Sequence, residues 1–208
     1  MHPARYFHEQ GEAALSTLVA ERGFGLIIGV ADGRPVAAHA AFLLEGRRLR
    51  FHLSRMNALT PVLEAQGRCL AVVTGPDAYI SPDWYGLDDQ VPTWNYLSVE
   101  MEGPLAVLDD AAAAILLDDL SAHFEAKLAP KPPWTRAKMS PERFELMVSK
   151  GIRAFEMRVE RLEGITKLSQ NKAPEVIERT AAALSALADP GSREIARLMR
   201  RSGPTPRG

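Results

Sequence analysis

Residues 24–53, FGLIIGVADGRPVAAHAAFLLEGRRLRFHL, hold three strand patterns separated by two turn patterns. The first run, FGLIIGV, is rich in residues that favour strands, and the ADGR after it is typical of a tight hairpin turn. PVAAHAAFLL follows, EGR marks a second turn, and RLRFHL alternates as a half-buried strand does. The stretch therefore predicts a meander of three antiparallel strands.

Three further runs predict strands downstream of this meander. They are RCLAVVTG at 68–75, YLSVEMEGPLAVL at 96–108 and GIRAFEMRVERLEG at 151–164, which we interpret as one long last strand. Gly103 and Pro104 mark a bend or an edge within the second run. The predicted fold class is α+β, mainly β with helices, with six or seven mostly antiparallel strands. Strands of this kind usually close into a barrel, because closure removes the sheet edges.

Helical periodicity predicts helices between the strands and at both ends of the chain. Asn57 or Thr60 suits the cap of the short helix after the meander. Asp109 or Asp110 suits the cap of a later helix, and Ser140 suits that of the next one. The predicted helical segments are 9–23, 54–67, 109–128, 140–148, 174–188 and 192–201.

The composition is that of an ordinary globular protein. The net charge of −1 argues against a chain coated in positive charge for general nucleic-acid binding. Cys69 is the one cysteine, so no intrachain disulfide forms, and a reducing cytoplasm is the expected location. We expect Cys69 to be a small buried apolar residue rather than a reactive thiol. The longest apolar runs are too short to span a bilayer, and one Cys with five scattered His gives no zinc-ligand pattern.

Aromatic residues gather in the long connection from 79 to 96. It holds five of the seven Tyr and Trp residues of the chain, and a surface loop rarely leaves such rings bare. Two interpretations stay open: the rings pack on the core of the chain, or they cover a flat ligand or a partner subunit. The aromatic residues of this segment are Tyr79, Trp84, Tyr85, Trp94 and Tyr96.

A group of polar residues follows the third strand of the meander, where a helix is predicted to begin. It consists of His52, Ser54, Arg55 and Asn57. Free backbone N–H groups at a helix start, together with a guanidinium, form a common anion site. The alternative is that Ser54 and Asn57 only cap the helix.

His39 interrupts an apolar strand, and we interpret it as a core residue with a satisfied hydrogen bond rather than a catalyst. A denser polar stretch is ITKLSQNK at 165–172, in which only one hydrophobic residue stands out and nothing resembles core or a simple turn. It offers two ammonium groups, two hydroxyls and two amides. No phosphate-binding glycine loop, catalytic triad or paired-carboxylate pattern is recognisable elsewhere.

Several motifs together resemble one known family. AYISPDWYG, VPTWNY and KLSQN, in this order and spacing, are similar to the PaiB-type FMN-binding negative transcriptional regulators. The resemblance covers residues 6 to about 171 and includes FHLSRMN. It implies an FMN-binding split β-barrel related to pyridoxamine-phosphate oxidases, typically a homodimer with flavin at the subunit interface. Residues 1–171 would form the barrel domain, and 172–208 a helical extension packing on the barrel or on the dimer partner.

The resemblance also implies where the cofactor binds. The first polar group would meet the phosphate and ribityl chain, and Trp94 and Asn95 would contact the ring. The KLSQN stretch would hydrogen-bond to the cofactor, from one subunit or the other, through Lys167, Ser169, Gln170 and Asn171. Two departures stand out: HAAF lacks a proline that the family often has, and Asp77 occupies a position that often holds His. The cofactor-binding residues implied are His39, His52, Ser54, Arg55, Asn57, Trp94, Asn95, Lys167, Ser169, Gln170 and Asn171.

Three functions remain open at this stage. The first is an FMN-dependent oxidoreductase or flavin-linked regulator, with catalytic residues and substrate undecided. The second is a repressor that binds DNA through the C-terminal helices, where four arginines lie on or near the last helix. Packing explains the apolar residues of these helices equally well. The third is a split barrel that binds another planar ligand, such as haem, with His39 or His52 as an axial ligand.

Overall fold

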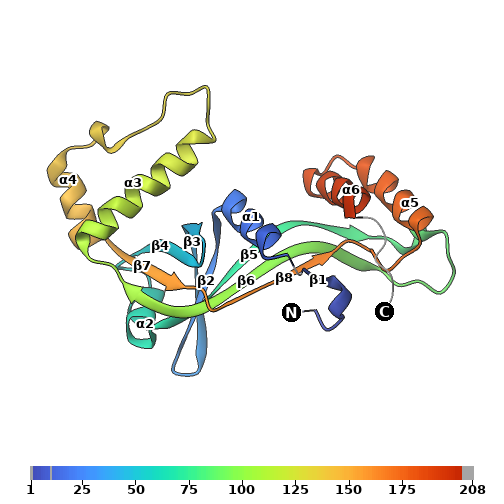
Figure 1. The fold of residues 1–208 in the computed structure, drawn as a ribbon, viewed down its shortest axis with the longest axis horizontal. Coiled ribbons are helices and arrows are strands. Elements are labelled where there is room, and N and C mark those ends of the chain that lie inside the picture. Colours follow the sequence, from blue (N-terminus) through green and yellow to red (C-terminus); the bar gives the residue numbers. More distant parts are fainter. Residues whose placement is uncertain (1, 10, 203–208) are drawn as a thin grey trace. The chain divides into compact units, whose positions relative to one another are not determined.

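The chain divides into two compact units (Figure 1). A computed structural model describes residues 2–9 and 11–202. Unit 1 comprises residues 1–18, 74–99 and 163–208, and unit 2 comprises 19–73 and 100–162. The division into residues 1–171 and 172–208 stays a prediction, because neither boundary is tested.

Six antiparallel strands form the closed barrel of unit 2. β6 (Thr93–Val107) and β5 (Arg68–Ile80) contribute residues to both units. The strand order is β6-β5-β2-β3-β4-β7, and β7 pairs again with β6, which closes the ring. The other strands of the ring are β2 (Phe24–Ala31), β3 (Arg34–Glu45), β4 (Arg48–Ser54) and β7 (Ile152–Arg158). The predicted antiparallel barrel is therefore confirmed.

The meander has the predicted turns. Asp32 and Gly33 have φ angles of 50° and 75°, which is the left-handed geometry of a two-residue hairpin turn. Alternate residues of the strands point into the barrel, where Phe51 and Phe155 stack with ring centroids 5.4 Å apart. Cys69 is buried there too, and burial raises the pKa of its thiol to about 12. This pKa matches the inert apolar role expected from the sequence.

Two strand predictions need correction. The last long strand is two strands, β7 and β8 (Arg161–Lys167), and a short strand, β1 (His8–Glu9), pairs with β8. The sheet therefore has eight strands among the described residues. β6 continues through Gly103, where a Cβ would lie 1.9 Å from the carbonyl oxygen of Arg158. A glycine is needed here because the backbone at Arg158 approaches the backbone of β6 closely.

Helices complete unit 2. α3 (Asp110–Ala126) covers β7, and its apolar face packs in a cluster with Val148, Ile152 and Ala154. Asp109 caps α3, and Ser140 caps α4 (Pro141–Leu146), both as predicted. The remaining elements are α2 (Leu59–Gln66), a 3-10 turn at Arg136–Lys138 and a π-helical turn at Met147–Gly151.

The C-terminal helices belong to unit 1. α5 (Pro174–Ser185) and α6 (Pro190–Ser202) pack with Ala78, Ile80 and Tyr85 in one apolar cluster. α6 begins two residues earlier than predicted, because the Asp189 carboxylate accepts the backbone N–H of Ser192 and caps it. α1 (Glu12–Arg22) contributes to both units, and short 3-10 turns lie at Arg5–Phe7 and Pro82–Tyr85. No helix in residues 2–9 and 11–202 is long and apolar enough to cross a membrane.

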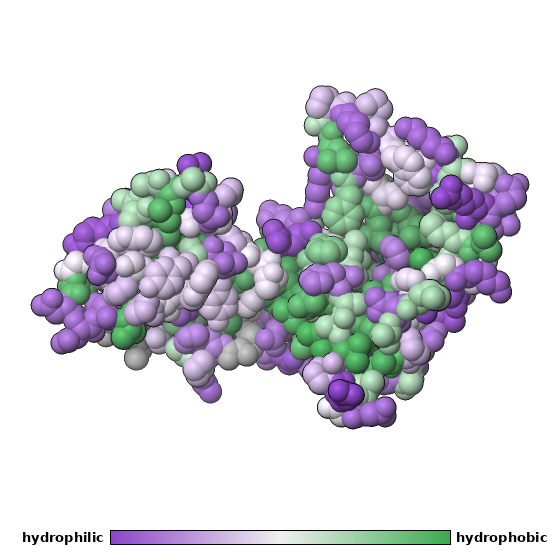
Figure 2. Space-filling model, turned by 180° about the vertical axis from the view of Figure 1, so that it is seen from behind, coloured by the Kyte–Doolittle hydropathy of each residue, from purple (hydrophilic) through white to green (hydrophobic). Residues whose placement is uncertain are grey.

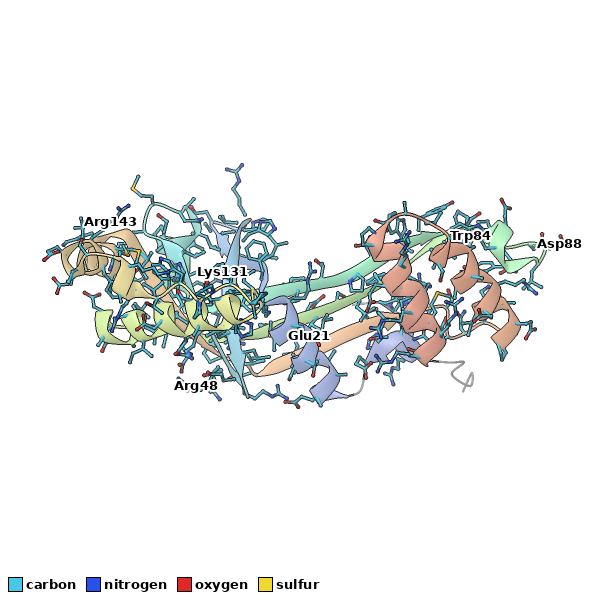
Figure 3. The ribbon with its side chains drawn as sticks, turned by 90° about the horizontal axis from the view of Figure 1, so that it is seen from above. Glu21, Arg48, Trp84, Asp88, Lys131 and Arg143 are labelled. Carbon is cyan, nitrogen blue, oxygen red and sulfur yellow. The ribbon has the colours of Figure 1, made fainter. Side chains whose placement is uncertain are left out.

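Only the two ends of the predicted aromatic loop from 79 to 96 lie in strands. Tyr79 ends β5, and Trp94 and Tyr96 lie near the start of β6, so the true connection is much shorter. Tyr85 is buried, and Trp84 packs against the same apolar cluster as α5 and α6; Figure 3 labels Trp84 on this connection. Tyr79 and Trp94 are about half exposed and meet edge to face, with centroids 6.0 Å apart. Part of the aromatic group is therefore core and part is surface.

Candidate functional site

The turn between β4 and α2 brings four of the predicted residues together in unit 2. His52 lies on β4 opposite Ala154 of β7, and Ser54 ends the strand. The backbone N–H of Arg55 donates to the carbonyl oxygen of Gly151, at 3.0 Å, which anchors the turn to the end of the π-helical segment. The two side chains with basic nitrogen atoms, His52 and Arg55, are thus held at one end of the barrel wall.

Two buried nitrogen atoms of this turn have no hydrogen-bond partner within the described residues. They are Nδ1 of His52 and Nε of Arg55. Burying a polar group without a partner costs about 1–3 kcal/mol, so such atoms are rare in native proteins. Burial also lowers the pKa of the His52 imidazole, because the charged form loses hydration. Each atom would be satisfied by a hydrogen-bond acceptor bound beside it.

Ser54 and Asn57 already have structural roles in the turn. The Asn57 side-chain oxygen accepts the backbone N–H of Leu59 at 2.9 Å, and the Ser54 hydroxyl accepts that of Met56 at 3.2 Å. Thr60 lies inside α2, and its hydroxyl donates to the carbonyl oxygen of Ser54. Asn57 therefore bonds to the backbone at the start of α2 from just outside the helix, and Thr60 lies within the helix and does not cap it.

His39 is not a core residue. It lies exposed on β3, opposite Leu26 of β2, and its ring stacks on Phe24 with centroids 5.6 Å apart. Phe24 is itself about half exposed. The core interpretation was wrong because alanines occur on both faces of this strand, so no alternation of polar and apolar residues shows which face is buried.

The second polar group lies in unit 1, in the turn after β8. Contrary to the expectation from its composition, Leu168, Ser169 and Gln170 are all buried. The Gln170 side chain bridges the turn: its oxygen accepts the N–H of Leu168 at 2.7 Å, and its nitrogen donates to the carbonyl oxygen of Thr166 at 2.6 Å. The Lys172 N–H donates to the Ser169 carbonyl oxygen at 2.9 Å. The stretch is a buried turn that its own side chains hold together.

A buried amide–hydroxyl pair fixes this turn to β6. Asn95 is fully buried, and its side chain exchanges hydrogen bonds of 3.0 and 3.2 Å with the Ser169 hydroxyl. Ser169 has a φ of 59°, in the left-handed region that few non-glycine residues adopt. The side chains in this frame therefore form their hydrogen bonds within unit 1, as seen for Asn95, Ser169 and Gln170.

The two lysines of the turn have a different setting. Lys167 and Lys172 line a pocket of about 300 Å³ together with Tyr85 and Asn171, all within unit 1. Trp94 lines a separate groove of about 340 Å³ on β5 and β6, which also includes Asp77 and Tyr96. The predicted residues of unit 1 thus divide among a buried frame, a lysine pocket and an aromatic groove.

Most of the chain, including the β4–α2 turn, matches a known protein family. A family model described as "Putative FMN-binding domain" matches residues 1–161. The chain belongs to this PaiB-type family of FMN-binding proteins. It is also 29% identical over 203 residues, 96% of both chains, to "Protease synthase and sporulation protein PAI 2" of Bacillus subtilis (strain 168).

Solved structures share the fold of this PaiB-type protein. The flavocytochrome Anf3 from Azotobacter vinelandii has a TM-score of 0.59 at 15% identity, over 80% of this chain and 72% of that one. The FAD and heme binding protein from Mycobacterium smegmatis has a TM-score of 0.55 at 21% identity, over 77% of this chain and 73% of that one. Both alignments support the split barrel.

The residues of the PaiB-type protein fit FMN by their chemistry. The cofactor of this family carries a phosphate, and the β4–α2 turn offers a guanidinium and an imidazole with buried nitrogen atoms that lack an acceptor. Phosphate oxygens are strong acceptors for such groups. The PaiB-type protein is therefore an FMN-binding protein whose clearest unsatisfied donors lie in unit 2.

Three of the four arginines of α6 are engaged in contacts within the C-terminal helical segment. Arg200 forms a bidentate ion pair with Glu178 of α5, and Arg197 pairs with Glu194 one turn earlier. Arg193 donates from Nε to the carbonyl oxygen of Leu187 at 2.7 Å. The apolar residues between them are buried against unit 1. These contacts favour packing over DNA recognition as the role of the tail.

Proposed function

We propose that the β4–α2 turn binds the phosphate of FMN and that the chain works as a flavin-dependent redox protein. The observation that carries this proposal is the pair of buried, partnerless nitrogen atoms on His52 and Arg55. FMN, when bound, supplies one- or two-electron redox chemistry. The chain binds and orients it, and the positive end of the α2 dipole favours the anion.

Arg55 and His52 have separate tasks in this proposal. The guanidinium stays charged at any physiological pH, so Arg55 neutralises the phosphate. His52 is held neutral by burial and offers a ring N–H as a hydrogen-bond donor. The contacts predicted from the sequence for Trp94, Lys167 and the residues after it stay predictions.

We propose further that the chain is a homodimer in the cytoplasm. The support is an apolar face on β2 and β3, where Phe24 and Val30 are about half exposed. Strand alternation and the register add Leu26, Ile28 and Ala37 to the same face. Figure 2 shows apolar side chains gathered over unit 2.

A second copy of the chain is the occupant of this face that the family resemblance implies. Sedimentation of the Val30→Glu variant beside the unaltered chain tests the dimer. If the variant is still a dimer, this face is not the dimer interface.

Spectroscopy of the purified chain tests the cofactor. We expect the visible bands of an oxidised flavin and the release of FMN, not FAD, on denaturation. A Soret band in their place would favour the haem alternative. A colourless protein that cannot be loaded with FMN would contradict the proposal.

A pair of arginine variants tests the phosphate site. Arg55→Ala should lower FMN affinity by about a hundredfold, the range lost with a buried charge-assisted contact. Arg48→Ala is the matched control, since Arg48 lies on β4 but is exposed and paired with Glu156. The phosphate assignment is wrong if Arg55→Ala retains FMN as well as Arg48→Ala does.

A further inference from the structure

Lys167 and Lys172 face one pocket that unit 1 builds from three segments of the chain. The segments are residues 2–7, 85–93 and 167–172, and the pocket has a volume of about 300 Å³. This is the size of a small-molecule site. The pocket therefore has the dimensions of a site as well as two cationic groups on its wall.

Each ammonium group is held by one neutral oxygen and one aromatic ring. Nζ of Lys167 donates to the Thr93 hydroxyl at 2.6 Å and lies 5.5 Å from the centre of the Phe7 ring. Nζ of Lys172 donates to the Gln90 side-chain oxygen at 2.5 Å and lies 4.6 Å from the Tyr85 ring. An ammonium group has three donors, and each of these two ammonium groups forms one hydrogen bond within residues 2–9 and 11–202, which leaves donors for a ligand.

Neither lysine forms an ion pair with a carboxylate in the part of the chain that the structure describes. Elsewhere the chain pairs its cations readily, as Arg161 does with Glu102. Asp89 brings the one carboxylate among the lining residues, and it makes no ion pair with either lysine. The pocket wall thus carries two positive charges against one negative charge.

The buried frame of the turn holds these ammonium groups in place. Ser169 and Gln170 fix the backbone between the two lysines through the hydrogen bonds described above. Burial lowers the pKa of Lys167, because its charged form has lost hydration that no counter-ion replaces. A pair of charged donors held in fixed positions is the arrangement that favours an anion.

We propose that this pocket binds the oxyanion group, carboxylate or phosphate, of a small organic molecule other than FMN. Tyr6, Phe7 and Val91 give the pocket an apolar wall that suits an apolar body behind the anion. That the ligand is distinct from FMN rests on the proposed function, since FMN has one phosphate and the β4–α2 turn takes it. The ligand is then the second reactant or effector of the flavoprotein.

Calorimetry on the FMN-loaded full chain tests the proposal with three probes. Benzoate and inorganic phosphate are the anionic probes. Benzyl alcohol is the control, because it has the ring of benzoate without the negative charge. We expect benzoate or phosphate to bind at least tenfold more tightly than benzyl alcohol, and the better of the two identifies the oxyanion. Lys172→Met and Lys167→Met should each weaken that binding by roughly tenfold or more. Lys150→Met, an exposed lysine of unit 2, should leave it unchanged.

Two kinds of result would overturn the proposal. The first is equal binding of the anions and benzyl alcohol, or anion binding that Lys172→Met does not change while thermal unfolding shows the variant folded. The second is loss of FMN from the lysine variants, which would assign the pocket to the cofactor, as the sequence predicted. Failure of the proposed function is a separate result: Arg55→Ala keeps its FMN, whatever the lysine variants do.

Discussion

The turn after β4 and the turn after β8 are both rich in polar side chains, yet they use them differently. In the first, buried nitrogen atoms of His52 and Arg55 have no partner within the described residues. In the second, the buried side chains of Asn95, Ser169 and Gln170 bond to each other and to the backbone. The first turn has buried donors that lack an acceptor. In the second turn the buried polar side chains have partners, and its two lysines line a pocket.

This difference separates residues that support the fold from residues that bind. A satisfied buried network rigidifies a structure, and removing one member leaves the others without partners. An unsatisfied buried group costs stability until its ligand arrives, so removing it should not destabilise the free protein. Substitutions in the two turns should therefore affect stability in opposite ways.

The largest expected effect is the loss of Asn95. Asn95→Ala removes both hydrogen bonds to the Ser169 hydroxyl and leaves a cavity at a fully buried position. We expect the free energy of unfolding to fall by about 2–4 kcal/mol. Urea unfolding of the FMN-free chain measures it, and a loss below 1 kcal/mol, roughly one ordinary hydrogen bond, would show that this turn is not a structural frame.

Ser169 allows a sharper test, because its backbone and side-chain contributions can be separated. Ser169→Ala and Ser169→Gly both remove the hydroxyl, but only glycine adopts a φ of 59° without strain. We expect the alanine variant to be less stable than the glycine variant by about 1 kcal/mol. Equal unfolding midpoints in urea would mean that the left-handed backbone at this position carries no cost.

Arg55 should behave in the opposite way. Arg55→Met keeps most of the apolar stem and removes the buried Nε that lacks a partner. We expect the FMN-free chain to unfold within about 0.5 kcal/mol of the original, or to be slightly more stable. A loss above 2 kcal/mol, well outside that range, would place Arg55 with the structural residues and remove the contrast between the two turns.

The smallest expected effect is a pH dependence from His52. Burial lowers the pKa of this imidazole in the folded chain, so the unfolded chain binds a proton first as the pH falls. The stability that His52 contributes is therefore present above its unfolded pKa, about 6.5, and is lost as pH falls below it. His52→Gln should flatten the dependence of the unfolding free energy on pH between about 7 and 5, and an unchanged slope would contradict it.

The sequence predicted the barrel because its determinants are local. The hairpin at Asp32 and Gly33 and the alternation of β4 are visible in a few neighbouring residues. The break between β7 and β8 was missed because the apolar pattern runs on across Val159, which is buried like the strand residues beside it. The four residues of the predicted anion group lie at one turn because they are nearly adjacent in the chain, and their contact with FMN stays a prediction.

The role of the KLSQN stretch could not be predicted from its composition. Polar residues suggest a surface or a ligand, and only the structure shows that Ser169 and Gln170 are buried and satisfied. Their partners include Asn95, 74 residues away, and no local period links the two positions. The lysine pocket was missed for the same reason, since Lys172 meets Gln90 and Tyr85 only through the fold.

The order of segments in unit 1 has a consequence for synthesis on the ribosome. Unit 2 ends at residue 162, so its barrel can close while the C-terminal helices are still being made. Until α5 and α6 can pack on them, the apolar side chains of Ala78, Ile80 and Tyr85 stay uncovered. At roughly 5–20 residues per second, that delay lasts several seconds, during which the nascent chain exposes an aggregation-prone surface.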